Sequence, residues 1–70
     1  MEYSYYKVYP EVNGVYQERI VCKDIFEVQA TVKWIREEYD GYIIIGHIRE
    51  NKEDVIVARE HFTRGMSRYR

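Results

Sequence analysis

The chain has 70 residues, 46% of them hydrophobic, and a formal net charge of -1, because eleven Lys and Arg stand against twelve Asp and Glu. This composition indicates one small folded domain and excludes a low-complexity linker. One Cys excludes an intramolecular disulfide framework, and two His without a Cys-x-x-Cys pair argue against a structural zinc site. The chain carries neither a membrane-spanning apolar run nor a signal-peptide pattern, so we expect a cytoplasmic protein with no membrane partner.

The first two elements expected along the chain form a β-hairpin. Residues 3–9 are rich in Tyr and Val, which favour a strand in a half-buried sheet. Pro10 lacks an N–H, so we expect it to limit that end of the strand to an edge or exit position. Asn13-Gly14 is typical of a two-residue hairpin turn, and a second strand is predicted over about residues 15–22.

A helix is predicted to follow the hairpin. Asp24 is a good N-cap residue, and Glu27 three positions later completes a capping-box pattern. The helix is expected to extend to about Tyr39, and Gly41 to end it in the left-handed conformation. Apolar residues recur at alternating spacings of three and four, which predicts one core-facing stripe: Ile25, Val28, Val32, Ile35 and Tyr39.

Two further strands are predicted, over about residues 42–49 and about residues 55–61. Three consecutive Ile in the first of them indicate burial on both faces, so we expect this strand inside the sheet. The order β-β-α-β-β predicts an α+β domain over residues 1–62, with a mainly antiparallel four-stranded sheet covered on one face by a single helix. Residues 63–70 form a basic C-terminal tail with three Arg and no acidic residue.

The predicted helix carries a second apolar stripe on the side opposite the core stripe. At about 100° per residue, Phe26, Ala30 and Trp34 fall together there. Three occupants are open: the tail with Phe62, Met66 and Tyr69, a second copy of the chain, or a different protein. Association stabilises a chain this small, which favours a homodimer. We therefore predict a partner-binding surface made of Phe26, Ala30, Trp34, Lys33 and Glu37.

No pattern in the sequence predicts an enzyme. Cys22 precedes the helix N-cap, where a thiolate is favoured, but we expect it to be a small buried residue at a strand end. His47 and His61 are predicted about 17 Å apart along the sheet, too far to share a metal ion. We predict no catalytic residue, cofactor, metal ligand or small-molecule substrate.

The first hairpin provides an alternative function, the binding of single-stranded nucleic acid. In the register that a two-residue turn sets, Val8 faces Arg19. One face of the hairpin then carries side chains suited to stacking on bases and contacting phosphate, namely Tyr3, Tyr5, Lys7, Tyr9 and Tyr16. The tail adds three cations, Arg64, Arg68 and Arg70. The negative net charge, and Glu11 and Glu18 on the same face, argue against this alternative.

The expected function is therefore that of a small non-enzymatic protein-interaction module. It would either self-associate or bind a partner protein as an inhibitor or adaptor, through the second stripe of the helix. Small proteins without cofactors often serve in this way, for instance in mobile elements, which is an expectation from size alone. The β-β-α-β-β order itself is shared by too many small domains to indicate a function.

Overall fold

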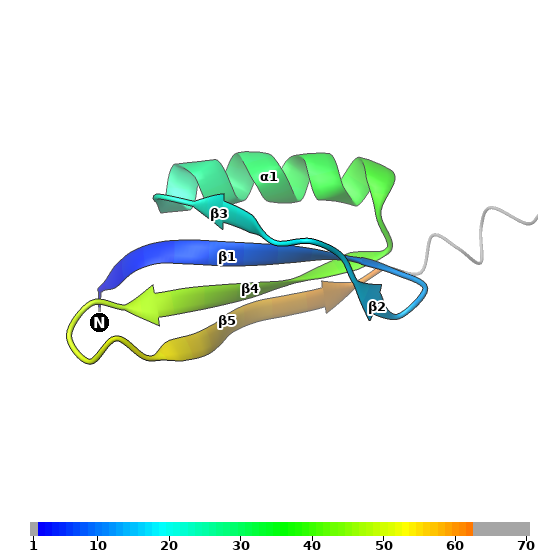
Figure 1. The fold of residues 1–70 in the computed structure, drawn as a ribbon. Helices are drawn as coiled ribbons and strands as arrows, with labels where there is room; N and C mark the ends of the chain where they lie inside the picture. The colour runs from blue at the N-terminus through cyan, green and yellow to red at the C-terminus, as the bar shows by residue number, and fades with distance from the viewer. Residues whose placement is uncertain (1, 63–70) are drawn as a thin grey trace, which may run out of the picture.

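One helix lies on one face of a single antiparallel sheet (Figure 1). The computed structural model describes residues 2–62, and the predicted tail over residues 63–70 lies outside them. Along the chain the elements are β1 (Tyr3–Val12), β2 (Val15–Tyr16), β3 (Ile20–Cys22), α1 (Ile25–Glu38), β4 (Gly41–Ile48) and β5 (Asp54–His61).

The strands follow the order β2-β1-β4-β5, and β3 pairs with β1 along the edge that β4 leaves free. All of these pairings are antiparallel. The predicted α+β class is confirmed, and so is the interior position of the strand that contains the three Ile residues, because β4 lies between β1 and β5. The predicted second strand is split into β2 and β3, so the sheet has five strands instead of four.

Pro10 lies inside β1, so the prediction that it restricts the strand to an edge or exit position is wrong. The Pro10 carbonyl accepts a hydrogen bond from the Gln17 N–H at 2.7 Å, on the side away from β4. In an antiparallel strand the N and O of one residue point to the same side, so the missing N–H of Pro10 also faces the second strand. The ladder is interrupted there, between β2 and β3, and the pairing with β4 is kept.

The interruption shifts the register of the hairpin by one residue. Beyond it Val8 faces Ile20, instead of the predicted Arg19. A one-residue slip exchanges the two faces of a strand. Ile20 and Cys22 therefore pack into the core on the helix side of the sheet, while Val21 is exposed on the opposite face.

The two-residue turn of the first hairpin is confirmed. Asn13 and Gly14 have φ angles of 51° and 82°, the positive values that a type I′ turn requires. Two carboxylates hold its amides: the Asn13 N–H donates to Asp40 Oδ2 at 2.9 Å, and the Gly14 N–H donates to Glu11 Oε2 at 3.0 Å. The turn is therefore joined to the connection between α1 and β4.

The core lies between the sheet and the inner face of α1, which packs on β1, β3 and β4. Of the predicted core stripe, Val28 and Ile35 are buried and Val32 and Tyr39 are partly buried, whereas Ile25 is exposed. Complete burial of a side chain such as Ile35 stabilises the fold by about 1.5–3 kcal/mol. The buried residues of the hydrophobic core are Val8, Cys22, Val28, Ile35, Tyr42 and Ile44.

The start of α1 agrees with the capping prediction. Asp24 Oδ1 accepts a hydrogen bond from the Glu27 N–H at 3.0 Å, as an N-cap side chain should. Glu27 Oε1 in return accepts from the N–H of Lys23 at 2.9 Å, one residue before the usual partner in a capping box. Both carboxylates thus hold the first turn of the helix.

The end of α1 differs from the prediction. The helix ends at Glu38, and Tyr39 is already extended, with φ -125° and ψ 172°. Gly41 is not in the left-handed conformation; it is the first residue of β4. Its missing side chain serves close packing, because a Cβ at this position would lie 2.5 Å from the backbone oxygen of Glu60 and 2.6 Å from Glu11 Oε1.

We predict that Gly41→Ala destabilises the protein by about 1–3 kcal/mol, because the added methyl group collides with a backbone oxygen that cannot rotate away. Urea denaturation measures the loss. Gly14→Ala is the comparison, since a Cβ there meets nothing within 4 Å and reports only the cost of its positive φ. A Gly41→Ala stability within about 0.5 kcal/mol of wild type would contradict the prediction.

Candidate functional site

The outer face of α1 carries the aromatic stripe that the sequence predicts. Phe26 is 75% exposed and Trp34 is 44% exposed, and the exposed Ala30 lies between them. The inner face of the same helix supplies Val28 and Ile35 to the core, so the stripe points away from the sheet. Within residues 2–62 the stripe therefore has no covering layer.

Trp34 is held in a defined orientation although nearly half of it is exposed. Its ring meets the ring of Tyr39 edge-on, with the ring centres 5.2 Å apart and the planes at 69°. Tyr39 itself packs against the core. A large aromatic side chain on a rigid helix, already ordered by a neighbour, is typical of an interface anchor, because little conformational entropy is lost on binding.

Charged side chains flank the stripe. Lys33 and Glu37 are both exposed, and neither forms an ion pair within the described part of the chain. At the start of the helix, Lys23 Nζ lies 4.0 Å from Glu27 Oε2, a loose contact between exposed groups. Charges of both signs therefore flank the stripe at each end.

The suggestion that Phe62 covers the stripe is not supported by its position. The Phe62 ring lies 6.0 Å from the ring of Tyr42, and the Arg36 guanidinium lies 5.4 Å above it. Phe62 therefore packs against the core, on the sheet side of the helix. Met66 and Tyr69, the other residues of that suggestion, lie outside the described residues.

The sheet face opposite α1 carries most of the predicted nucleic-acid residues. Tyr5, Lys7, Tyr9 and Tyr16 line two shallow depressions on this face. Tyr3 is turned to the helix side, where its ring lies 5.3 Å from the ring of Tyr6, because the β1–β4 register shifts between Tyr3 and Tyr5. The three Arg of the prediction, Arg64, Arg68 and Arg70, lie outside the described residues.

Two cations, Lys7 and Arg19, line these depressions, and Lys7 is already paired. Lys7 Nζ donates to Asp54 Oδ2 at 2.8 Å, and the other Asp54 oxygen lies 2.8 Å from His47 Nδ1. The His47 ring stacks on Tyr5, with the ring centres 4.7 Å apart and the planes at 13°. The pKa of Asp54 is lowered mainly by its hydrogen bond with Lys7 and secondly by its hydrogen bond with His47. The Lys7–Asp54 hydrogen bond also raises the pKa of Lys7. A phosphate would have to compete with Asp54 for Lys7.

The residues considered for chemistry lie in separate places. Cys22 is buried, as predicted, with its Sγ 3.5 Å from Thr31 Oγ1. His61 Nδ1 lies 3.0 Å from Glu11 Oε2, whereas His47 contacts Asp54. Across residues 2–62 no group of three or more His, Cys, Asp or Glu side chains is placed to hold a metal ion. In the same part of the chain no helix has the length and apolar character that crossing a membrane requires.

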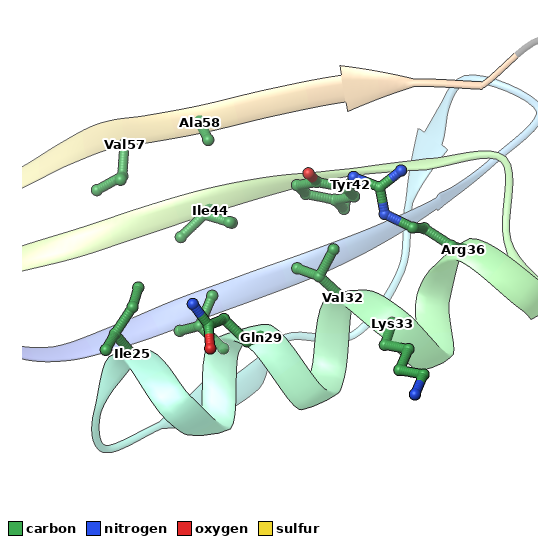
Figure 2. A pocket seen from close by; sticks show the side chains of 10 residues that line it. Ile25, Gln29, Val32, Lys33, Arg36, Tyr42, Ile44, Val57 and Ala58 are labelled. Atoms are coloured by element: carbon green, nitrogen blue, oxygen red, sulfur yellow. The ribbon is translucent and has the colours of Figure 1, made fainter.

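A second candidate surface, which the sequence did not predict, is a groove between α1 and β5 (Figure 2). It has a volume of about 420 Å³, and Val32, Ile44, Val57 and Ala58 contribute to its apolar lining. Simple alternation along a strand would place Val57 and Ala58 on opposite faces. The β4–β5 register shifts between Ile44 and Ile45, leaving Val57 as an extra residue, so both side chains point into the groove.

Comparisons of this chain with protein-family models, with curated proteins and with solved structures find no match. Its function is therefore inferred from these surfaces.

We predict that Asp54→Asn lowers the free energy of unfolding at neutral pH, because the variant loses the ion pair with Lys7. The pKa of Asp54 is lowered from 3.8 in the folded state, so its contribution is complete above that value and is lost as the pH falls through the folded pKa. Urea denaturation at neutral pH and in acid should give a difference between wild type and variant that shrinks below pH 3.8. Glu50→Gln in the exposed loop is the control, and an equal difference at both pH values would refute the assignment.

Proposed function

We propose that this protein is a non-enzymatic protein-interaction module that pairs with a second copy of itself through the outer face of α1. The observation that carries the proposal is the exposure of Phe26 and Trp34 on the side of the helix opposite the core. Large exposed aromatic residues grouped on one rigid element are more typical of an interface than of a solvated surface.

The stripe is complementary to itself under a two-fold axis, which favours a second copy as the occupant. In an antiparallel pair of helices centred on Ala30, residues equally far from Ala30 in opposite directions lie at the same height. Phe26 then lies beside the partner's Trp34, and the small Ala30 lets the two helices approach closely.

The size of the chain provides a reason for association. A core built from one helix and one face of a small sheet supplies only about 3–5 kcal/mol of net stability. Pairing through α1 would bury the aromatic stripe and add to that stability without changing the fold of either copy. A dimer of this kind also presents two sets of sheet surfaces to further partners.

We predict that Trp34→Glu weakens self-association about 30-fold or more, the effect expected for a central aromatic anchor worth at least about 2 kcal/mol. Light scattering behind a sizing column, at several concentrations, should give a mass near twice 8.6 kDa for wild type and near 8.6 kDa for the variant. Circular dichroism should show that the helix is retained, because Trp34 does not belong to the buried core cluster.

Val15→Glu is the matched control, since Val15 is an exposed apolar residue in β2, away from the helix. It should leave the mass unchanged. A wild-type protein that is monomeric at all concentrations, or a Trp34→Glu protein that remains dimeric, would refute pairing through this face.

Single-stranded nucleic acid is the alternative ligand. The observation in its favour is the stacked pair of Tyr5 and His47 beside Lys7 on the open face of the sheet. The Asp54 carboxylate that neutralises Lys7 is the main observation against it. Fluorescence anisotropy of a labelled oligo-dT at low salt tests it, because phosphate contacts require an affinity that falls as salt rises. No binding at low salt would remove this alternative.

A further inference from the structure

The groove between α1 and β5 exists because one helix is too narrow for this sheet. A helix with its side chains is about 10 Å wide, and neighbouring strands are about 4.8 Å apart, so one helix covers roughly two strands. α1 packs on β1, β3 and β4, and the helix-side surface of β5 extends beyond it (Figure 1). The part of the sheet left uncovered on this side is β5, which is one strand wide.

Apolar side chains from both walls face this space (Figure 2). Val32 approaches from α1, Ile44 forms part of the floor, and Val57 and Ala58 come from β5. Val57 is 41% exposed. The bulge in β5 places two adjacent apolar residues here instead of one, which enlarges the apolar surface on the uncovered side of the sheet.

The two charged side chains that line the groove are cations, and one of them is paired with an acidic residue at the rim. Lys33 and Arg36 lie on its α1 wall, and the residues that line it within the described part of the chain include no Asp or Glu. Arg36 donates to Glu60 at 2.9 Å, at the rim, whereas Lys33 has no ion pair within residues 2–62. Lys33, whose ammonium group is directed away from Val57 and Ala58 (Figure 2), is therefore the lining cation that remains to pair with an acidic side chain of a bound partner.

We propose that this groove binds an amphipathic helix of a partner protein, with the helix lying alongside α1, its apolar side on Val57 and Ala58, and acidic residues toward Lys33. The groove extends from Ile25 to Arg36, about 16 Å along α1, which matches three turns of a bound helix. A strand added to the edge of β5 would leave the groove empty, and the bulge interrupts the regular edge that such a strand needs.

This site is distinct from the self-association surface. The stripe of Phe26 and Trp34 lies on the outer face of α1 and the groove lies on its sheet side, and the two surfaces meet at Lys33. The groove, and not the stripe, is the site proposed to bind a helix of another protein. In this mode of recognition, apolar side chains at helical spacing on the bound helix provide affinity, and charged side chains beside them set its orientation.

Two displayed libraries of 18-residue peptides test the proposal. In the first, Leu is fixed at helical spacing and the flanking positions vary among Glu, Gln and Lys; in the second, Leu is fixed at every other position. We expect enrichment from the helical library only, with Glu preferred on one flank. Val57→Lys should weaken binding of an enriched peptide at least about tenfold, because a charge then occupies the apolar wall.

Lys33→Glu provides a readout that does not depend on the stability of the Val57 variant. It should reverse the preferred flank from Glu to Lys in a repeated selection. Val15→Lys, an equally simple change on the distant hairpin, should have no effect on either readout. The monomeric Trp34→Glu variant should still bind the enriched peptides, which separates this proposal from the proposed dimer.

Failure of both libraries to enrich, enrichment of the alternating library alone, or binding that survives Val57→Lys with an unchanged flank preference would each overturn the proposal. The second of these results would indicate strand addition to β5, and the third would place the peptide elsewhere on the protein.

Discussion

The missing N–H of Pro10 is the constraint on which the layout of this sheet depends. Pro10 lies in the strand that pairs with neighbours on both sides, and its missing donor faces the hairpin side, not β4. The long β1–β4 ladder is therefore intact, and the partner strand is interrupted instead. Because the interruption changes the register by one residue, Ile20 and Cys22 reach the helix side and complete the core beside Val8.

A second constraint is the ratio of one helix to one broad sheet. α1 buries its aliphatic face against the sheet, and within residues 2–62 no second layer covers its outer face. The same helix is too narrow to cover the helix-side surface of β5. The two candidate binding surfaces are thus consequences of the same shortage of helical cover. One is aromatic and flanked by charges of both signs, which suits a copy of itself, while the other is aliphatic and bordered by Lys33.

The helix, the strands and the turn of this fold follow from local sequence patterns. Which strand side chains point to which face of the sheet does not. The capping residue Asp24, the turn at Asn13-Gly14 and the helical spacing of the core stripe each depend on a few neighbouring residues, so the sequence predicts them. The faces depend on one-residue shifts between strands. Two such shifts turn Tyr3 toward the helix and bring Val57 into the groove. The residue types at those positions do not predict either shift.

The carboxylates that hold the first hairpin turn have a consequence for engineering. Turn tips are the usual places to insert a peptide or to open a chain for circular permutation. Here the amides of Asn13 and Gly14 are bonded to Asp40 and Glu11, so an insertion at this turn would loosen the junction between helix and sheet. The loop between β4 and β5 is better suited to insertion around Asn51, because the hydrogen bonds of residues 51–53 remain within the loop and its adjoining strand end, whereas Arg49 at the start of the loop is bonded to Glu2.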